Sequence, residues 1–121
     1  MYYILKNMKP QRSKERMLKG IISILILDEL IDSPLHGYAI EKSISEKLGK
    51  KLPPGMIYVM LKTLEIKGCI ESEETKGKTG RSVKIYHITD SGKNLLKEHL
   101  EQLEKLKNLL DEIIERVKHK I

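Results

Sequence analysis

The side chains that this sequence lacks exclude several classes of protein. None of its 121 residues is Phe or Trp, so the core has to be built from aliphatic side chains. Cys69 is the single cysteine, which excludes an internal disulfide and a zinc site built on paired thiols. We expect Cys69 to be a small buried apolar side chain.

Long hydrophobic segments are also missing. The densest apolar run, residues 21–27, is interrupted by Ser23 and is far shorter than a membrane span. The apolar patch near the N-terminus is too short for a signal peptide. The sequence therefore predicts a cytoplasmic protein that has no membrane partner.

Positive charge is concentrated in two segments of the chain. The sequence carries 23 basic and 17 acidic side chains, a formal net charge of +6. Residues 1–20 hold six Lys or Arg and one acid, and residues 76–84 hold four Lys or Arg and no acid. Such a distribution is compatible with nucleic acid as a partner.

Three segments in the first half of the chain have the periodicity of amphipathic helices. Residues 14–31 are followed by a break at Pro34. Residues 37–48 repeat an apolar side chain at every fourth position and end before a glycine. A third helix is predicted from about Pro54, which suits a first helical turn, to residue 68. The apolar stripes are predicted to contain Leu18, Ile21, Ile22, Leu25, Ile26, Ile40, Ile44, Leu48, Ile57, Leu61 and Leu64.

Two strands and a long helix are predicted in the second half. The basic, glycine-rich segment between the two strand-like runs, residues 69–75 and 83–88, makes them a β-hairpin. Thr89 is expected to cap a helix that continues to about Lys118, a length on the order of 45 Å. Three helices followed by a basic hairpin is the layout of a winged helix-turn-helix. We predict a mainly α fold with a small β-hairpin, divided into an N-terminal extension (1–13), a winged helix-turn-helix domain (14–89) and a C-terminal dimerisation helix (90–121).

The third helix and the hairpin are the candidate DNA-binding elements. A winged helix-turn-helix lays one helix in the major groove and contacts phosphates around it. Both elements are also compatible with ordinary solvated surface, but two basic surfaces at the ends of one docking face favour double-stranded DNA. The third helix is predicted to contribute Gly55, Met56, Tyr58, Val59, Lys62 and Thr63, and the hairpin Lys76, Lys78, Thr79, Arg81 and Lys84.

Several stretches of the sequence resemble the PadR family of transcriptional regulators. They are "PLHGYAI", "PPGMIYVMLKTLEIKGCIES", "GKTGRSVKIYHITDSG" and the long last helix, so the match covers nearly the whole chain. The resemblance implies a cytoplasmic homodimer that usually represses transcription and often loses DNA when a small molecule binds. It also implies that Gly37 and Tyr38 begin the second helix at a DNA phosphate, and that His36 is a cap or a phosphate neighbour.

The sequence departs from the family pattern at two places. Pro53 stands where family members usually carry a capping Ser or Thr, so the third helix is expected to begin less firmly. The last helix lacks the aromatic side chain with which some members trap flat aromatic drugs between the two protomers. Any small-molecule effector is therefore of unknown chemistry.

The last helix carries a heptad pattern of apolar residues. Side chains from Leu96 to Val117 recur at intervals of seven, and Leu106 and Ile113 form a companion series. A domain of this size cannot cover the whole stripe, so we predict a homodimer. Two-fold symmetry then predicts an inverted-repeat operator with half-sites roughly 34 Å apart. The predicted interface contains Leu96, His99, Leu100, Leu103, Leu106, Leu110, Ile113, Ile114 and Val117.

No arrangement of residues predicts catalysis. His36 and His87 have no cysteine or acidic cluster at ligand spacing, so we expect no enzyme activity, catalytic residue, metal or cofactor. The main alternative function is a winged-helix module that dimerises and binds protein without recognising DNA, although such a module does not need a basic wing. Residues 1–13 keep two interpretations, a basic arm that reaches DNA or a segment that packs on the dimer.

Overall fold

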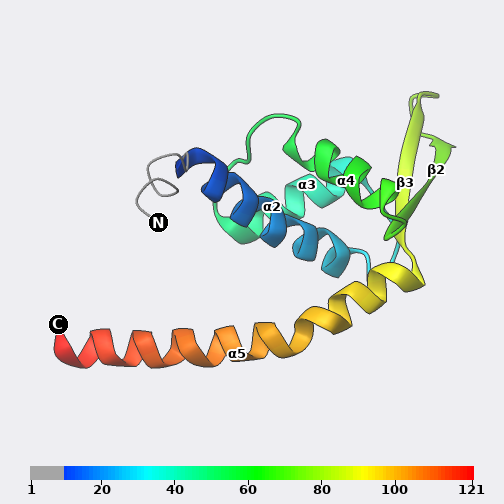
Figure 1. The fold of residues 1–121 in the computed structure, drawn as a ribbon. Coiled ribbons are helices and arrows are strands. Elements are labelled where there is room, and N and C mark those ends of the chain that lie inside the picture. The colour runs from blue at the N-terminus through cyan, green and yellow to red at the C-terminus, as the bar shows by residue number, and fades with distance from the viewer. Residues whose placement is uncertain (1–9) are drawn as a thin grey trace.

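A computed structural model of the protein describes residues 10–121. Three helices lie beside a small sheet, and a long last helix runs from the sheet along the body and out beyond it (Figure 1). Residues 1–9, which belong to the segment with two interpretations, lie outside the described residues. The elements are α2 (Pro10–Glu29), β1 (Leu35–His36), α3 (Gly37–Leu48), α4 (Met56–Ile66), β2 (Ile70–Lys76), β3 (Ser82–Ile88) and α5 (Asp90–Lys120).

The predicted order of helices and strands is confirmed, with differences at two helix starts. Helix α2 begins at Pro10 rather than at residue 14. Helix α4 begins at Met56, so the prediction that Pro54 lies in its first turn was wrong. The reason is Gly55, which takes the N-cap position with a left-handed φ of 77° that cannot continue into an α-helix. The N-cap residue is Gly55 and makes no side-chain cap hydrogen bond, and the expectation drawn from Pro53 of a less firm start stays a prediction.

The core is aliphatic, as the absence of Phe and Trp requires. On α2, Ile22 and Ile26 are fully buried four residues apart, and Leu30, directly after the end of the helix, is also buried in the same core cluster. The predicted stripe on α2 was partly wrong, because Ile21 is 45% exposed and Leu27 is buried instead. The rest of the buried core consists of Ile40, Ile44, Ile57, Met60, Leu61, Leu64, Cys69, Ile70 and Tyr86, which confirms the expectation for Cys69.

The sheet has three antiparallel strands in the order β1-β3-β2. Strands β2 and β3 form the predicted hairpin, whose tip is closed by a hydrogen bond from the Gly77 amide to the Arg81 carbonyl. Strand β1 was not predicted and contains only two residues. Its register pairs Leu35 with Tyr86 and His36 with Ile85. This short strand therefore holds the start of α3 beside the β2–β3 hairpin, residues 70–88, which is called the wing below.

A tight junction connects the end of α4, the sheet and the start of α5. Thr89 is the predicted N-cap of α5: its Oγ1 accepts a hydrogen bond from the Gly92 amide at 3.1 Å. The same hydroxyl donates to the Gly68 carbonyl at 2.6 Å, and the Thr89 amide donates to the Cys69 carbonyl at 3.1 Å. A Cβ atom on Gly92 would lie 2.2 Å from the Cys69 carbonyl oxygen, so only glycine fits where α5 crosses this turn.

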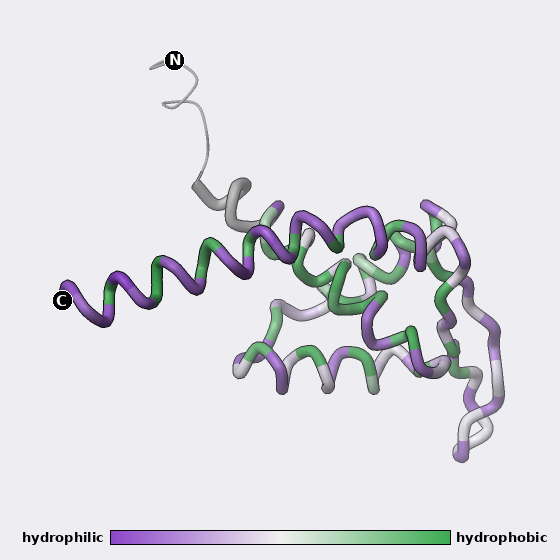
Figure 2. Tube along the Cα trace, turned by 90° about the horizontal axis from the view of Figure 1, so that it is seen from below, coloured by the Kyte–Doolittle hydropathy of each residue, from purple (hydrophilic) through white to green (hydrophobic). Residues whose placement is uncertain are grey.

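The two halves of α5 have different surroundings. Leu95 and Leu96, near its start, pack against the core. From Leu100 to Val117 the apolar side chains are 39–53% exposed, and they recur along the helix as Figure 2 shows in green. None of the helices within residues 10–121 combines the length and apolar character needed to cross a membrane.

A polar contact fixes the end of α2 against α3. The Ser43 hydroxyl donates to Glu29 Oε1 at 2.7 Å, and Lys47 Nζ donates to the same oxygen. Burial of the Glu29 carboxyl raises its pKa, but the hydrogen bonds from Lys47 and Ser43 and the charge of Lys47 outweigh this effect. The pKa of Glu29 is therefore lowered.

Candidate nucleic-acid interface

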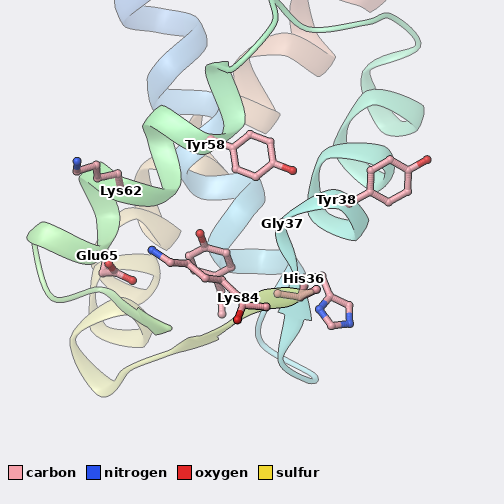
Figure 3. A pocket seen from close by; sticks show the side chains of 10 residues that line it. His36, Gly37, Tyr38, Tyr58, Lys62, Glu65 and Lys84 are labelled. Atoms are coloured by element: carbon pink, nitrogen blue, oxygen red, sulfur yellow. The ribbon is translucent and has the colours of Figure 1, made fainter. Parts of the chain in front are cut away.

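A cleft of about 520 Å³ opens between the start of α3, one face of α4 and strand β3 (Figure 3). It joins segments that are far apart in the sequence, and six of its residues belong to the predicted DNA-binding set. The six predicted residues are His36, Gly37, Tyr38, Tyr58, Lys62 and Lys84, and the remaining four are Glu65, Ser82, Val83 and Tyr86.

Regular secondary structure places these side chains on the cleft walls. On α4, Tyr58, Lys62 and Glu65 are spaced by four and three residues, so they lie on the same helix face. On β3, alternate residues point to the same side of the sheet, which brings Lys84 and Tyr86 to the cleft. Two walls of the cleft therefore follow from the spacing of residues along α4 and β3, and the start of α3 forms the third wall.

Gly37 is required by the position of Tyr58. Gly37 is buried, and a Cβ atom there would lie 2.8 Å from Cε1 of the Tyr58 ring. The contact that the structure gives this glycine is thus with an aromatic ring, whereas the family resemblance implied close approach to a phosphate. The Tyr58 side chain, packed in this way, remains 49% exposed, and Tyr38 on α3 is 70% exposed.

Two lysines give the cleft a positive rim. Lys62 lies on the outer edge of α4, and Lys84 extends from β3 toward α4 (Figure 3). Tyr86 is buried and also lines the cleft. Burial raises its pKa, and the Glu65 carboxylate raises it further, so this hydroxyl stays neutral at pH 7. Two lysines and three tyrosines thus line the cleft, and their amino and hydroxyl groups are donors of the kind that bind phosphate oxygens.

His36 lies at the N-cap position of α3, but its side chain makes no cap hydrogen bond. Its backbone is extended, with φ −72° and ψ 152°, because it belongs to strand β1. The residue lines the cleft, but its exposed imidazole points away from Tyr58 and Lys84, as Figure 3 shows. His36 therefore takes the cap position that the resemblance implied, without a side-chain cap bond, and its role as a phosphate neighbour stays a prediction.

The rest of the predicted set on α4 lies outside this cleft. Val59 is 57% exposed, whereas Met56 is partly buried against the core, so less of Met56 can reach DNA. Thr63 Oγ1 donates to the Val59 carbonyl at 2.9 Å, so its hydroxyl is already satisfied within the helix. Gly55 shapes the helix start, as described above.

The basic residues of the wing tip are all exposed and lie beyond the cleft. Lys76 ends β2, and the turn after it contains Lys78, Thr79 and Arg81. Gly80 turns the chain with a φ of 80°. The surface around the cleft therefore continues along the hairpin as a basic extension.

Sequence comparison identifies the family. Residues 26–98 match the model of the family described as "Transcriptional regulator PadR-like family". These residues include the cleft, the wing and the start of α5. This chain belongs to the PadR-like family. The predicted resemblance is confirmed, and the chain is a transcriptional regulator with a winged-helix fold. Regulators of this family are not enzymes, so the prediction of a non-enzyme is also confirmed.

Individual relatives agree with this assignment. A solved structure of a transcriptional regulator from Thermoplasma acidophilum is 39% identical, with a TM-score of 0.75, and the match covers 83% of this chain and 96% of that one. A transcriptional regulator of Mycobacterium tuberculosis is 30% identical over 73% of this chain and 80% of its own. A 37.1 kDa transposon protein of Streptomyces fradiae is 35% identical over 69% of this chain, which spans only 23% of that relative's length.

The predicted interface residues of this PadR-like chain fall into two groups. Leu96 and His99 are half-buried; Leu96 packs on the core of the domain, and the His99 ring Nδ1 is 2.9 Å from the Leu95 carbonyl oxygen. The other seven are exposed along α5, namely Leu100, Leu103, Leu106, Leu110, Ile113, Ile114 and Val117.

His87, the second histidine of the sequence motifs, lies on the wing. Its Nε2 is 3.1 Å from Glu71 Oε2 on the neighbouring strand β2. Within residues 10–121, no group of three or more His, Cys, Asp or Glu side chains is arranged to hold a metal ion. The geometry of His87 is that of a cross-strand pair on the wing surface.

Proposed function

We propose that the protein is a cytoplasmic homodimer that binds a specific double-stranded DNA operator, represses transcription, and is released by a small-molecule effector. The observation that supports it most strongly is the cleft, which is lined by Lys62 of α4, Lys84 of the wing and three tyrosines. These are the two elements with which a winged helix-turn-helix contacts DNA.

In this proposal α4 enters the major groove with its exposed face toward the bases. Lys62 reaches a guanine edge or a phosphate, and Val59 contacts a thymine methyl group. The phosphate backbone passes over the cleft beside Tyr38 and Lys84. The basic tip of the hairpin, with Arg81 at its end, holds the adjacent backbone or minor groove.

The proposed homodimer depends on the outer half of α5. From Leu100 to Val117, eight apolar side chains are exposed along the part of the helix that leaves the body of the domain, and seven of them belong to the predicted interface. An apolar surface of this kind is costly in water and is covered in a stable protein. A second copy covers it with the same stripe, and the two-fold axis then presents two α4 helices to an inverted repeat.

Repression and effector release come from the family rather than from the geometry. Helix α5, Asp90–Lys120, contains no aromatic residue. An effector that is stacked between aromatic side chains of the two last helices is therefore not part of the proposal. The chemistry of the effector is left open.

The test is fluorescence-polarisation binding to the DNA upstream of the protein's own gene, with a scrambled duplex as control, across a series of salt concentrations. We expect tight binding that prefers the native duplex and falls steeply with salt, because lysine and arginine contacts release counterions. A chain that dimerises but binds neither duplex at low salt would contradict the proposal and favour a protein-interaction module.

A further inference from the structure

Glu65 is the only acidic side chain among the ten residues that line the cleft. It projects from α4 one turn after Lys62, and Figure 3 shows Lys84 extending toward it from the opposite wall. A carboxylate at this position weakens the attraction of the two lysines for phosphate. A surface that served only to hold the DNA backbone would be better without it.

The Glu65 carboxylate also has an unsatisfied acceptor. Its Oε2 atom is buried and has no hydrogen-bond partner among the residues that the structure describes. A buried acceptor without a donor is destabilising, and buried polar groups in native proteins are rarely left in this state. A donor that reaches this oxygen gains a hydrogen bond without first removing water from it.

Tyr58, Lys62 and Glu65 form one stripe along α4, in which Tyr58 and Lys62 are exposed and Glu65 is half-buried at the wall of the cleft. The stripe offers a donor at Lys62 and an acceptor at Glu65 on successive helical turns. In the major groove, guanine presents two acceptors and cytosine presents an amino donor, so a donor followed by an acceptor matches a step that contains both bases.

We propose that Glu65 is a specificity-determining residue, which accepts a hydrogen bond from the exocyclic amino group of a cytosine in each operator half-site. This inference rests on the proposed function, because it requires α4 to lie in the major groove. The glutamate side chain has three rotatable bonds, so its carboxylate can follow the amino group to the mouth of the cleft. On DNA that offers no donor at this position, the carboxylate repels the phosphates and weakens binding.

The experiment is selection of preferred sites from a random-sequence duplex library, carried out with the full-length wild type, Glu65→Ala and Glu65→Gln. We expect the wild type to select an inverted repeat with one strongly preferred cytosine per half-site that Glu65→Ala no longer prefers. Glu65→Gln should change the preference toward adenine, which glutamine recognises with two hydrogen bonds. The cost of the lost contact should reduce the ratio of specific to random binding roughly tenfold.

Glu73→Ala is the matched control. It removes the same charge from an exposed residue on β2, whose register partner is Ile85, on the opposite face of the sheet from Lys84. It should leave the selected sequence unchanged. Circular dichroism and thermal melting of each variant establish that it is folded before selection.

The outcomes are distinct. Loss of one base preference in Glu65→Ala alone supports the inference. An unchanged selected sequence with Glu65→Ala and Glu65→Gln, at equal or uniformly reduced affinity, overturns it and assigns Glu65 a structural role. Failure of the wild type to select any sequence overturns the proposed function itself.

Discussion

The body of the domain and the outer half of α5 use the same aliphatic side chains with opposite results. In the body, Ile22, Ile40 and Leu61 are fully buried within one cluster. Along α5, Leu106, Leu110 and similar side chains are about half exposed. Residue type therefore does not decide burial in this chain. The body has three helices and a sheet around its core, whereas the outer half of α5 has no neighbour among residues 10–121 and is the surface that the proposed second copy covers.

The largest expected effect is on the stability of the proposed dimer. Leu110→Asp places a charge in the exposed stripe of both protomers, and we expect the dimer to lose about 4 kcal/mol or more, because two buried leucines are replaced by carboxylates. Analytical ultracentrifugation should show a monomer at micromolar concentration. Asn108→Asp, which lies outside the heptad stripe, should leave the dimer intact. A dimer that survives Leu110→Asp would show that the stripe is not the interface.

Within the body of the domain, we expect a substitution of Gly92 to lower the free energy of unfolding the most. Gly92→Ala places a methyl group 2.2 Å from the Cys69 carbonyl oxygen, so the junction has to open, at a cost of about 3 kcal/mol in the free energy of unfolding. Urea denaturation measures this loss. Gly20→Ala is the control, because nothing lies within 4 Å of its added Cβ atom and alanine favours the helix. Equal stabilities for the two variants would contradict the described junction.

In the proposed DNA-binding surface, we expect Lys62 on α4 to contribute to sequence recognition and Arg81 at the wing tip to contribute to binding of any sequence. Lys62→Ala should weaken specific binding by about 1–3 kcal/mol if Lys62 contacts a base. Arg81→Ala should weaken binding to all sequences alike and reduce the salt dependence. Polarisation titrations on specific and random duplexes at several salt concentrations measure both changes. Equal losses on the two duplexes for both variants would remove the distinction.

The smallest expected effect concerns the contact between α2 and α3. The pKa of Glu29 is lowered in the folded protein, so the ionised carboxylate contributes stability above its ordinary pKa of 4.5. This contribution is lost as the pH falls through the lowered pKa. Glu29→Gln should therefore be less stable than the wild type at neutral pH, and the difference should shrink in acid. Denaturant titrations from pH 7 to pH 3 test this, with the exposed Glu46→Gln as control.

Much of the fold follows from periodicity, because each predicted helix and strand is long enough to repeat its pattern several times. Strand β1 is two residues long and has no pattern to detect. Ile21 belongs to an apolar stripe in the sequence, yet its exposure depends on which face of α2 the other helices cover. Gly92 was missed because the atom that excludes a side chain there belongs to Cys69, more than twenty residues earlier.

The candidate interface was predicted in part for the same reason. Lys62 and Tyr58 follow from the exposed face of one helix, and the lysines of the wing follow from charge. Glu65 was not recognised as part of the cleft, although its spacing from Lys62 on α4 was available. Its importance depends on burial and on the wall formed by β3, which no single helical pattern contains.

The bonds around Thr89 have a consequence for operator length. Helix α5 contains 31 residues and is about 46 Å long. In the proposed dimer, which is joined along α5, this junction fixes the angle between each domain and the helix. A rotation of about 10° there shifts the far end of α5 by roughly 8 Å relative to its domain, more than two base-pair steps of about 3.4 Å. In that dimer, the three hydrogen bonds around Thr89 and the close contact at Gly92 would constrain the spacing of the half-sites.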